Sequence, residues 1–240
     1  MKMYLGCSGW YYDHWINRFY PIEIKKSEWL PYYAQNFQTV EINSTFYRFP
    51  REKMLQNWYE KTPEDFKFIL KVNQSITHRK KFKDTSNLLR NFYELSEYLR
   101  EKLGGLLFQL PPNIHKNMKI LKRALEQFDT SNNNVLEFRH PSWYDEDVYK
   151  LLDDYNVIFC SVSTSNLPQD LIVIKNKAYI RFHGTDEDKR YQHLYSDEEL
   201  RQWARKIKRE DISELYCYFN NDYHANAVKN CLKLKKLLED

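Results

Sequence analysis

Three short segments of the chain combine an alternating apolar strand pattern with polar residues where the pattern ends: residues 40–47, 137–143 and 179–184. Residues two apart on a strand share a face, so each segment presents two polar side chains opposite its apolar row. These pairs are Glu41 and Asn43, Glu137 and Arg139, and Arg181 and His183. Burying a charged side chain in an interior costs free energy unless the charge is paired or serves a function. The repeated pattern therefore predicts a site at the strand ends.

Apolar strand-like runs alternate with segments of helical period along the chain. The runs cover residues 3–8, 39–44, 66–73, 105–110, 135–140, 157–162, 178–183 and 215–220. This alternation predicts a parallel β/α fold, and eight strands favour a TIM-type (β/α)8 barrel over an open doubly wound sheet. Residues 163–177 contain Pro168 and lack a helical period, so the helix between strands six and seven is expected to be irregular or missing. We expect one domain, residues 1–240.

Helix starts are visible at several of the connections. Ser27, Thr85 and Asn117 each precede apolar residues at three- and four-residue steps, and Ser196 with Glu199 has the form of a capping box. A final helix over residues 227–238 is expected to close the ring of helices. These helices lie between the predicted strands, as a β/α barrel requires.

The amino-acid composition disfavours several classes of protein but does not identify one. The 37 basic and 33 acidic residues give a net charge of +4, which does not by itself indicate nucleic acid as a partner. The four cysteines form no C-x-x-C pair and are expected to be small buried apolar residues, as in a reducing cytoplasm. No leader-like or membrane-length apolar run is present, so a cytoplasmic protein without membrane contact is expected. Only 5 glycines occur, which excludes a glycine-rich phosphate loop.

Extending the strand alternation to all eight runs predicts an inward-facing polar set at one rim. This set contains two carboxylates and three cations. One positive charge therefore remains after the charges pair, and it favours an anionic or heavily hydroxylated ligand. We predict Glu41 and Glu137 as acid/base groups and His183 as a proton shuttle. Lys71, Arg139 and Arg181 are predicted as an anion clamp, and Asn43, Asn220 and Asn221 as groups that orient hydroxyls. The remaining predicted binding residues are Trp10, Tyr47, Gln109, His140 and Trp143; Ser161 and Ser163 are also expected to face inward.

Other interpretations of the same residues stay open at this stage. The charges could form a salt-bridge lattice that only plugs the barrel, although apolar residues would do this better. Glu41, Glu137, His183, His140 and Asp222 offer metal-ligand chemistry, but the neighbouring cations oppose it, so no metal or cofactor is expected. Asp222 either caps a helix or marks a phosphate site. The basic loop of residues 78–83 is either a solvated loop or a surface that steers a phosphate backbone.

The same stretches, taken together, resemble the YecE-like family, catalogued as domain of unknown function 72. They are Gly6-Cys7-Ser8-Gly9-Trp10, Phe19-Tyr20-Pro21, residues 40–47, Gln109-Leu110-Pro111-Pro112, residues 137–143, residues 179–184 and Phe219-Asn220-Asn221-Asp222. The resemblance runs in order over nearly the whole chain and implies a TIM-type barrel. Such a barrel is similar to those of apurinic-site endonucleases and sugar isomerases, which is an analogy of fold alone.

The chain departs from the family pattern near its ends. Cys7 stands where the family usually has Thr, at an outward-facing position. Ala225 stands where a Gly is usual, and Cys231 where an Ala is usual. A glycine lets a backbone approach an anion closely, so Ala225 weakens the idea of a phosphate site at that place.

Three functions are consistent with the residues. The first is an enzyme that acts on a phosphorylated or polyhydroxylated compound, derived from a sugar or a nucleic acid, by carboxylate acid/base chemistry at the rim. The second is a non-catalytic module that binds nucleic acid or a phosphorylated metabolite. The third is a metal-dependent phosphodiesterase. The oligomeric state does not follow from the residues.

Overall fold

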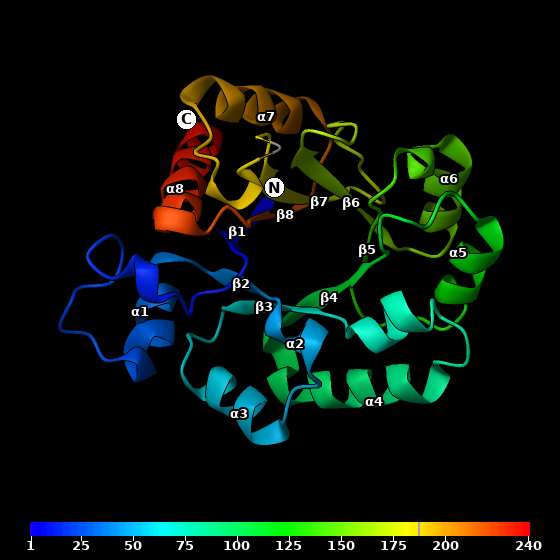
Figure 1. The fold of residues 1–240 in the computed structure, drawn as a ribbon, viewed down its shortest axis with the longest axis horizontal. Coiled ribbons are helices and arrows are strands. Elements are labelled where there is room, and N and C mark those ends of the chain that lie inside the picture. The colour runs from blue at the N-terminus through cyan, green and yellow to red at the C-terminus, as the bar shows by residue number, and fades with distance from the viewer. Residues whose placement is uncertain (187) are drawn as a thin grey trace.

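Eight parallel strands close into a barrel surrounded by helices in the computed structural model, which describes residues 1–186 and 188–240 (Figure 1). The strands pair in chain order, and β1 also pairs with β8 from Lys2 opposite Glu214 to Cys7 opposite Phe219. The predicted TIM-type barrel is confirmed. The strands are β1 (Lys2–Cys7), β2 (Thr39–Ile42), β3 (Lys67–Lys71), β4 (Leu103–Gln109), β5 (Asn134–Glu137), β6 (Ile158–Thr164), β7 (Lys177–Gly184) and β8 (Glu214–Phe219).

The helices fall where the apolar periods placed them, with several additions. They are α1 (Trp29–Asn36), α2 (Ser44–Tyr47), α3 (Glu52–Glu60), α4 (Ser86–Ser96), α5 (Met118–Leu125), α6 (Glu146–Asp154), α7 (Asp197–Arg209) and α8 (Asn226–Glu239). The Asn117 side chain accepts a hydrogen bond from the Ile120 backbone N–H, and Ser196 with Glu199 forms the predicted capping box. No helix lies in residues 165–176 between β6 and β7, so the predicted irregular crossover is confirmed.

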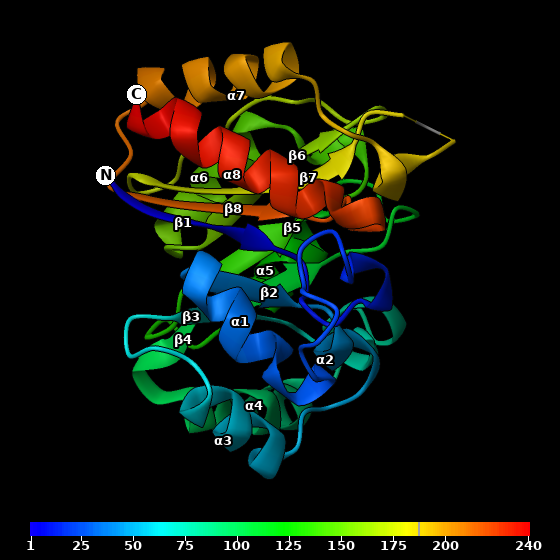
Figure 2. The ribbon, with the colours of Figure 1, turned by 90° about the vertical axis from the view of Figure 1, so that its left-hand side faces the viewer.

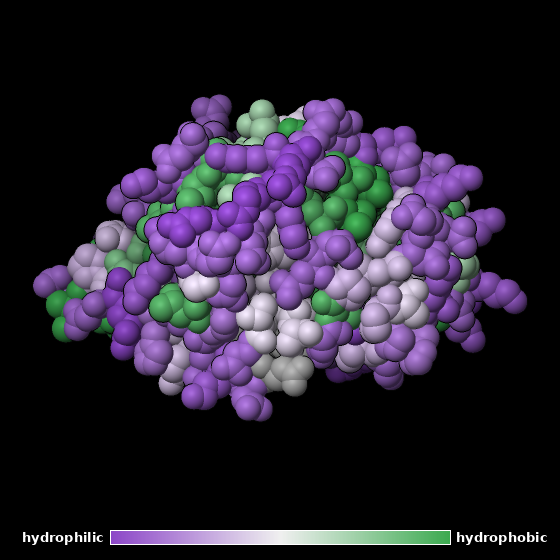
Figure 3. Space-filling model, turned by 90° about the horizontal axis from the view of Figure 1, so that it is seen from above, coloured by the Kyte–Doolittle hydropathy of each residue, from purple (hydrophilic) through white to green (hydrophobic). Residues whose placement is uncertain are grey.

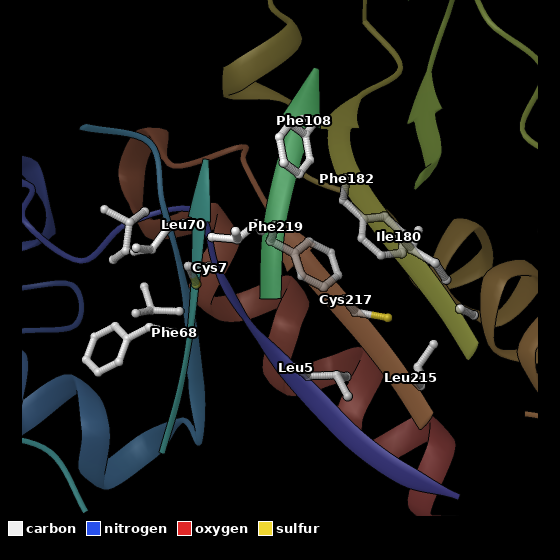
Figure 4. Packing of buried hydrophobic residues seen from close by; sticks show 14 of the residues in the cluster. Leu5, Cys7, Phe68, Leu70, Phe108, Ile180, Phe182, Leu215, Cys217 and Phe219 are labelled. Atoms are coloured by element: carbon white, nitrogen blue, oxygen red, sulfur yellow. The ribbon is translucent and has the colours of Figure 1, made fainter. Parts of the chain in front are cut away.

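Two apolar layers hold the barrel together. Figure 4 shows the strand side chains of the outer layer, among them Leu5, Phe68, Phe182 and Phe219, which belong to the cluster shared with the helices. The inner layer fills the barrel with aliphatic residues and tyrosines, and Tyr4 stacks on Tyr216 with ring centroids 5.0 Å apart. The four cysteines are buried and unpaired with one another, as predicted.

Strand β6 corrects one inward-facing prediction. Cys160 and Val162, rather than Ser161 and Ser163, belong to the inner layer. The Ser161 hydroxyl instead accepts a hydrogen bond from the backbone N–H of Ile172, in the crossover outside the barrel. Small or apolar residues occupy both rows of this strand, so its alternation does not distinguish the two faces.

The barrel has one end with the chain termini and one end with the long loops. In Figure 2 the arrow of β1 points away from the two termini and toward the loops that follow the strands. Figure 3 shows that the face above α7 is covered largely by hydrophilic side chains. No helix among the described residues is both long and apolar enough to traverse a bilayer. Active sites of TIM-type barrels lie at the carboxyl ends of the strands, so we expect a site of this barrel at the loop end.

We expect Gly6→Ala to destabilise the barrel by about 2 to 3 kcal/mol, as overpacking does. A Cβ at Gly6 would lie 2.2 Å from the Thr39 carbonyl oxygen, which belongs to the backbone of the neighbouring strand and cannot rotate away. Gly104→Ala is the matched control, because its Cβ meets Ile69 Cδ1 at 3.1 Å, an end of a side chain that can move. Urea unfolding measures both; equal effects would contradict the close approach of β1 and β2.

Candidate functional site

A polar cavity of about 470 Å³ opens at the carboxyl ends of the strands. Seven of the predicted site residues line it: Asn43, Tyr47, Lys71, Gln109, Arg139, Arg181 and Asn220. Five further lining residues were not predicted as members of the site: Phe46, Gln74, His78, Tyr191 and Asp222. We call this hollow the mouth cavity. It lies where catalytic sites of TIM-type barrels are found.

Arg181 joins the two predicted carboxylates beneath the mouth cavity. Its Nη1 donates to Glu137 Oε2 and its Nη2 to Glu41 Oε1, each at 2.6 Å. The Arg181 side chain is 1% exposed and both carboxylates are fully buried. Arg181 reached the interior as predicted, but its two terminal nitrogens already bind carboxylates. Clamping a ligand anion with them would require breaking a buried ion pair.

Glu41 uses both carboxylate oxygens within the protein. Ser8 Oγ and Arg181 Nη2 donate to Oε1, and Tyr179, from the tyrosine layer below, donates its hydroxyl to Oε2 at 2.7 Å. The residue is fully buried and does not line the mouth cavity. In this arrangement Glu41 orients Arg181 rather than facing a ligand.

Glu137 is held ionised beneath the cavity. Its Oε1 forms an ion pair with Arg139 Nε and lies 3.4 Å from His183 Nε2. Burial alone would raise the pKa of Glu137, but the guanidinium groups of Arg139 and Arg181 hold it well below the usual range. A carboxylate held in this way is a poor general acid.

His183 lies behind Arg139 as a neutral imidazole. Burial, followed by the charges of Arg139 and Arg181, holds the pKa of His183 well below its usual range. Arg139 Nη2 lies 3.0 Å from His183 Nε2 and can only donate, so Nε2 accepts and Nδ1 carries the proton. Asn220 Nδ2 lies 3.2 Å from Nδ1, so a proton on Nδ1 requires the carboxamide to be assigned in its turned orientation, with the oxygen toward the ring. His183 thereby links Arg139 to Asn220 without facing the cavity.

Lys71 takes no part in the ion pairs of Glu41, Glu137, Arg139 and Arg181. It ends β3, is 9% exposed and lies with its Nζ 4.3 Å from the centroid of the Phe46 ring. Among the described residues, none accepts a hydrogen bond from Nζ or forms an ion pair with it. Burial, and then the charge of Arg181, lower the pKa of Lys71 from 10.5 to about 7. The predicted surplus positive charge is therefore a titrating amine at neutral pH, because both arginines are matched by carboxylates.

His78 enters the cavity from a single π-helical turn, Ser75–Arg79, that follows β3. Its ring packs edge to face on Phe46 at 4.8 Å, and burial followed by the Lys71 charge lowers the pKa of His78 to about 4. The residue pattern predicts a basic loop at His78, because a π-helical turn leaves no apolar period to detect. Isolated π-helical turns are frequent at functional sites.

Four predicted binding residues do not line the mouth cavity: Trp143, His140, Asn221 and Trp10. Trp143 is fully buried, stacks on Phe138 and donates its Nε1–H to the Ile114 carbonyl, so its predicted role in ligand binding is wrong. His140 Nδ1 bonds the Ser142 hydroxyl within a tight turn. Asn221 is fully buried and donates to His193 and Asn230. These residues follow the strand ends, where the chain already turns outward over the helices.

Trp10 lines a separate, more apolar hollow of about 350 Å³. The ring of Trp10 packs edge to face against Trp58, at 5.4 Å. Asn43 belongs to both hollows and so connects this one with the mouth cavity. The Trp10 prediction thus places the residue beside the site, not within it.

The structure also bears on two alternatives that the sequence leaves open, one for the basic loop of residues 78–83 and one for Asp222. Phe82, the aromatic residue of the basic loop, is fully buried against Phe108 and Phe128 and offers no stacking surface. Asp222 makes no side-chain helix cap; its carboxylate lies 3.5 Å from His14 Nε2 and lines the mouth cavity. A carboxylate at this position opposes a phosphate there.

Residues 1–186 and 188–240 contain no group of three or more His, Cys, Asp or Glu side chains placed to hold a metal ion. The ligand set considered from the sequence is not assembled, because Arg181 occupies an oxygen of Glu41 and of Glu137, and His140 lies outside the cavity. Metal-ligand chemistry therefore finds no support in this geometry.

The fold defines a TIM-barrel protein, and a polar cavity lies at the mouth of its barrel. A family model described as "Protein of unknown function DUF72" matches residues 4–240, and the chain belongs to this family. The "UPF0759 protein YunF" of Bacillus subtilis is 26% identical, over 99% of this chain and 95% of that protein. The "UPF0759 protein YecE" of Escherichia coli is 27% identical, over 59% of this chain and 50% of that protein.

Solved structures of the same family show the same barrel. A DUF72 family protein from Thermotoga maritima superimposes with a TM-score of 0.91 at 32% identity, covering 100% of both chains. A DUF72 family protein from Enterococcus faecalis gives a TM-score of 0.85 at 20% identity, covering 99% of this chain and 96% of that one. The second likeness concerns the fold alone.

We expect Arg181→Met to destabilise the protein by about 3 to 5 kcal/mol, because it leaves two buried carboxylates without their shared cation. Adding Glu41→Gln and Glu137→Gln to that variant should recover at least half of the loss. Arg205→Met, which removes an exposed ion pair with Glu198, is the control and should cost less than about 1 kcal/mol. Urea unfolding gives these values; a triple variant no more stable than the single one would refute the bridging role.

The stability of the protein should also depend on pH through Lys71. Its pKa is about 7 in the folded chain and near 10.5 in the unfolded chain, so between these values the unfolded chain binds the extra proton. The free energy of unfolding then rises with pH by about 1.4 kcal/mol per pH unit, relative to Lys71→Met. Unfolding across this window measures the difference between the two proteins. A difference that does not change with pH would contradict the assignment.

Proposed function

We propose that this protein is an enzyme that acts on a small phosphorylated or polyhydroxylated compound in the mouth cavity. The observation that carries the proposal is an amine without a counter-ion among the described residues, in a cavity whose polar lining is mainly carboxamides and guanidinium groups, with His78 and the Asp222 carboxylate also present. Asn43, Gln109 and Asn220 supply carboxamides that donate to and accept from hydroxyls, and Arg139 supplies charge. A barrel plug without a function would not need an open polar cavity above it.

The proposal changes the roles expected from the sequence. Glu41 and Glu137 act as positioning residues, because they hold Arg181 and Arg139 in place from below. Lys71 replaces them as the acid/base group, since its pKa of about 7 lies near neutral pH, where proton transfer in both directions is efficient. His183 acts through Arg139 and Asn220.

Arg139 is the residue best placed to meet an anionic group. Its side chain is 14% exposed and lines the mouth cavity, while Nε and Nη2 face Glu137 and His183. Among the described residues, Nη1 has no partner, so it can donate to a phosphate or carboxylate. This supports anionic polyols over neutral apolar compounds as substrates.

The test is a thermal-shift screen of sugar phosphates and polyols, followed by NMR assays for turnover of the ligands found. Arg139→Gln should weaken their binding by about tenfold or more, as expected for loss of a hydrogen bond to a charged group. The exposed control Arg205→Gln should bind normally. Ligands that bind Arg139→Gln as tightly as the natural protein would contradict the site.

The non-catalytic alternative is tested by a separate measurement of DNA and RNA binding. It predicts salt-sensitive binding of DNA or RNA that is lost when Lys80 and Lys81 are both changed to Gln, with no dependence on Arg139 or Lys71. The buried position of Phe82 disfavours this alternative, because the loop then has charge but no aromatic surface for bases.

A further inference from the structure

We propose that Lys71 is a covalent nucleophile, which forms an imine with the carbonyl carbon of a hydroxylated aldehyde or ketone held in the mouth cavity. The inference rests on the proposed function and deepens it, because it assigns both the substrate class and the bond that forms. It departs from the sequence-based prediction, in which Lys71 was part of an anion clamp.

The position of Lys71 is that of a reactive amine rather than of a structural one. Its aliphatic stem is buried at the end of β3, its Nζ lies against the Phe46 ring, and it lines the mouth cavity. Lys102 provides the contrast within the same chain. It is 4% exposed, yet its Nζ donates to the Tyr59 carbonyl at 2.6 Å and to the Thr62 carbonyl at 2.7 Å. A lysine buried for structural reasons finds acceptors in this way, whereas no described residue provides one for Lys71.

The charges around Lys71 favour the neutral amine. Arg181 and Arg139 repel a proton on Nζ, and His78 is itself uncharged near neutral pH. Glu41 and Glu137 attract the proton, but each is already matched by a guanidinium. Burial adds to the repulsion, and the pKa of about 7 leaves about half of the amine unprotonated at neutral pH. Nucleophilic lysines are activated by this combination of desolvation and a neighbouring cation.

The chemistry needs no reagent beyond the two partners. The Nζ lone pair forms a bond to the carbonyl carbon while the C=O π electrons move to oxygen, which gains a proton originally on the nitrogen. The resulting carbinolamine loses its hydroxyl group as water, together with the second nitrogen proton, and leaves the imine. Amine and carbonyl compound are thus converted to imine and water without oxidation or reduction. Protonation of the imine nitrogen then draws electrons from the adjacent carbon, which is the usual purpose of such a link.

The walls of the cavity select a hydroxylated carbonyl compound. The carboxamides of Asn43, Gln109 and Asn220 offer both donors and acceptors to hydroxyl groups next to the carbonyl. His78, packed on the same Phe46 ring, supplies a neutral imidazole beside the amine. An apolar aldehyde would leave these groups without partners.

Reductive trapping tests the inference on the intact protein. The chain is treated near neutral pH with glyceraldehyde and limiting cyanoborohydride, which delivers hydride to imines, and the modified lysines are mapped by mass spectrometry over time. We expect Lys71 to be modified about tenfold faster than exposed lysines such as Lys235, because its lowered pKa of about 7 leaves a large part of its amine unprotonated near neutral pH. Lys102 should remain unmodified, and Lys71→Met should lose the fast site without a change at Lys235.

Modification of Lys71 at or below the rate of Lys235 would overturn the inference. This outcome is separable from failure of the proposed function. If sugar phosphates bind in an Arg139-dependent manner and Lys71 is not trapped, only the covalent step is wrong. If the Arg139-dependent ligands are absent from the screen and Lys71 is still trapped rapidly, the proposed function fails while the amine assignment stands.

Discussion

The bridge that Arg181 makes between Glu41 and Glu137 is the interaction on which the rest of the site depends. The two carboxylates come from strands on different sides of the barrel, and both are fully buried. Burying a carboxylate is costly unless a cation lies within hydrogen-bonding distance. Because each Arg181 terminal nitrogen binds one carboxylate at 2.6 Å, a single guanidinium satisfies both. Tyr179 and Ser8 complete the shell of Glu41 and tie the bridge to the apolar layer below.

This bridge also decides what remains available to a ligand. Apart from Asp222, whose carboxylate lies beside His14, the described charged groups at and beneath the barrel mouth are Glu41, Glu137, Arg139, Arg181 and Lys71. Pairing consumes the first four and leaves Lys71 without a counter-ion. Its amine then experiences burial and a neighbouring guanidinium without a compensating partner. The structure thus separates a charged, closed floor from an open cavity into which Lys71 brings an amine with a pKa of about 7. A floor made of apolar residues would be at least as stable, but it would not hold Arg139 or tune Lys71.

The sequence predicts the barrel well and the site only in part, for physical reasons. Eight amphipathic runs with helical segments between them leave few alternatives to a closed barrel, and the missing helix after β6 follows from Pro168 and the absence of an apolar period. The alternation of side chains between the two faces of a strand also places Glu41, Arg139 and Arg181 correctly at one end of the barrel. It does not tell which charges pair, since the partners come from strands far apart in the chain. For the same reason the sequence does not show that Lys71 is the group left unpaired.

The alternation of side chains gives wrong orientations where the chain has left the strand, or where both faces of the strand carry similar residues. Trp143 and Asn221 follow β5 and β8, and their side chains turn into the outer core, although their residue types suit a binding site. Ser161 faces outward because β6 has small or apolar residues in both rows. His78 escapes prediction because a π-helical turn, not a strand, brings it to the cavity.

The most direct test of this account is an NMR titration of the Lys71 side chain, followed at its Cε and Nζ in protein labelled at lysine. If Arg181 consumes both carboxylates and burial adds to its repulsion, the resonance should titrate with a midpoint near 7. Lysine side chains in model peptides titrate at about 10.4, and the exposed lysines of the same samples serve as the internal reference. A Lys71 midpoint at or above that of the exposed lysines would mean that a carboxylate is free to pair with it, and the central claim would be wrong.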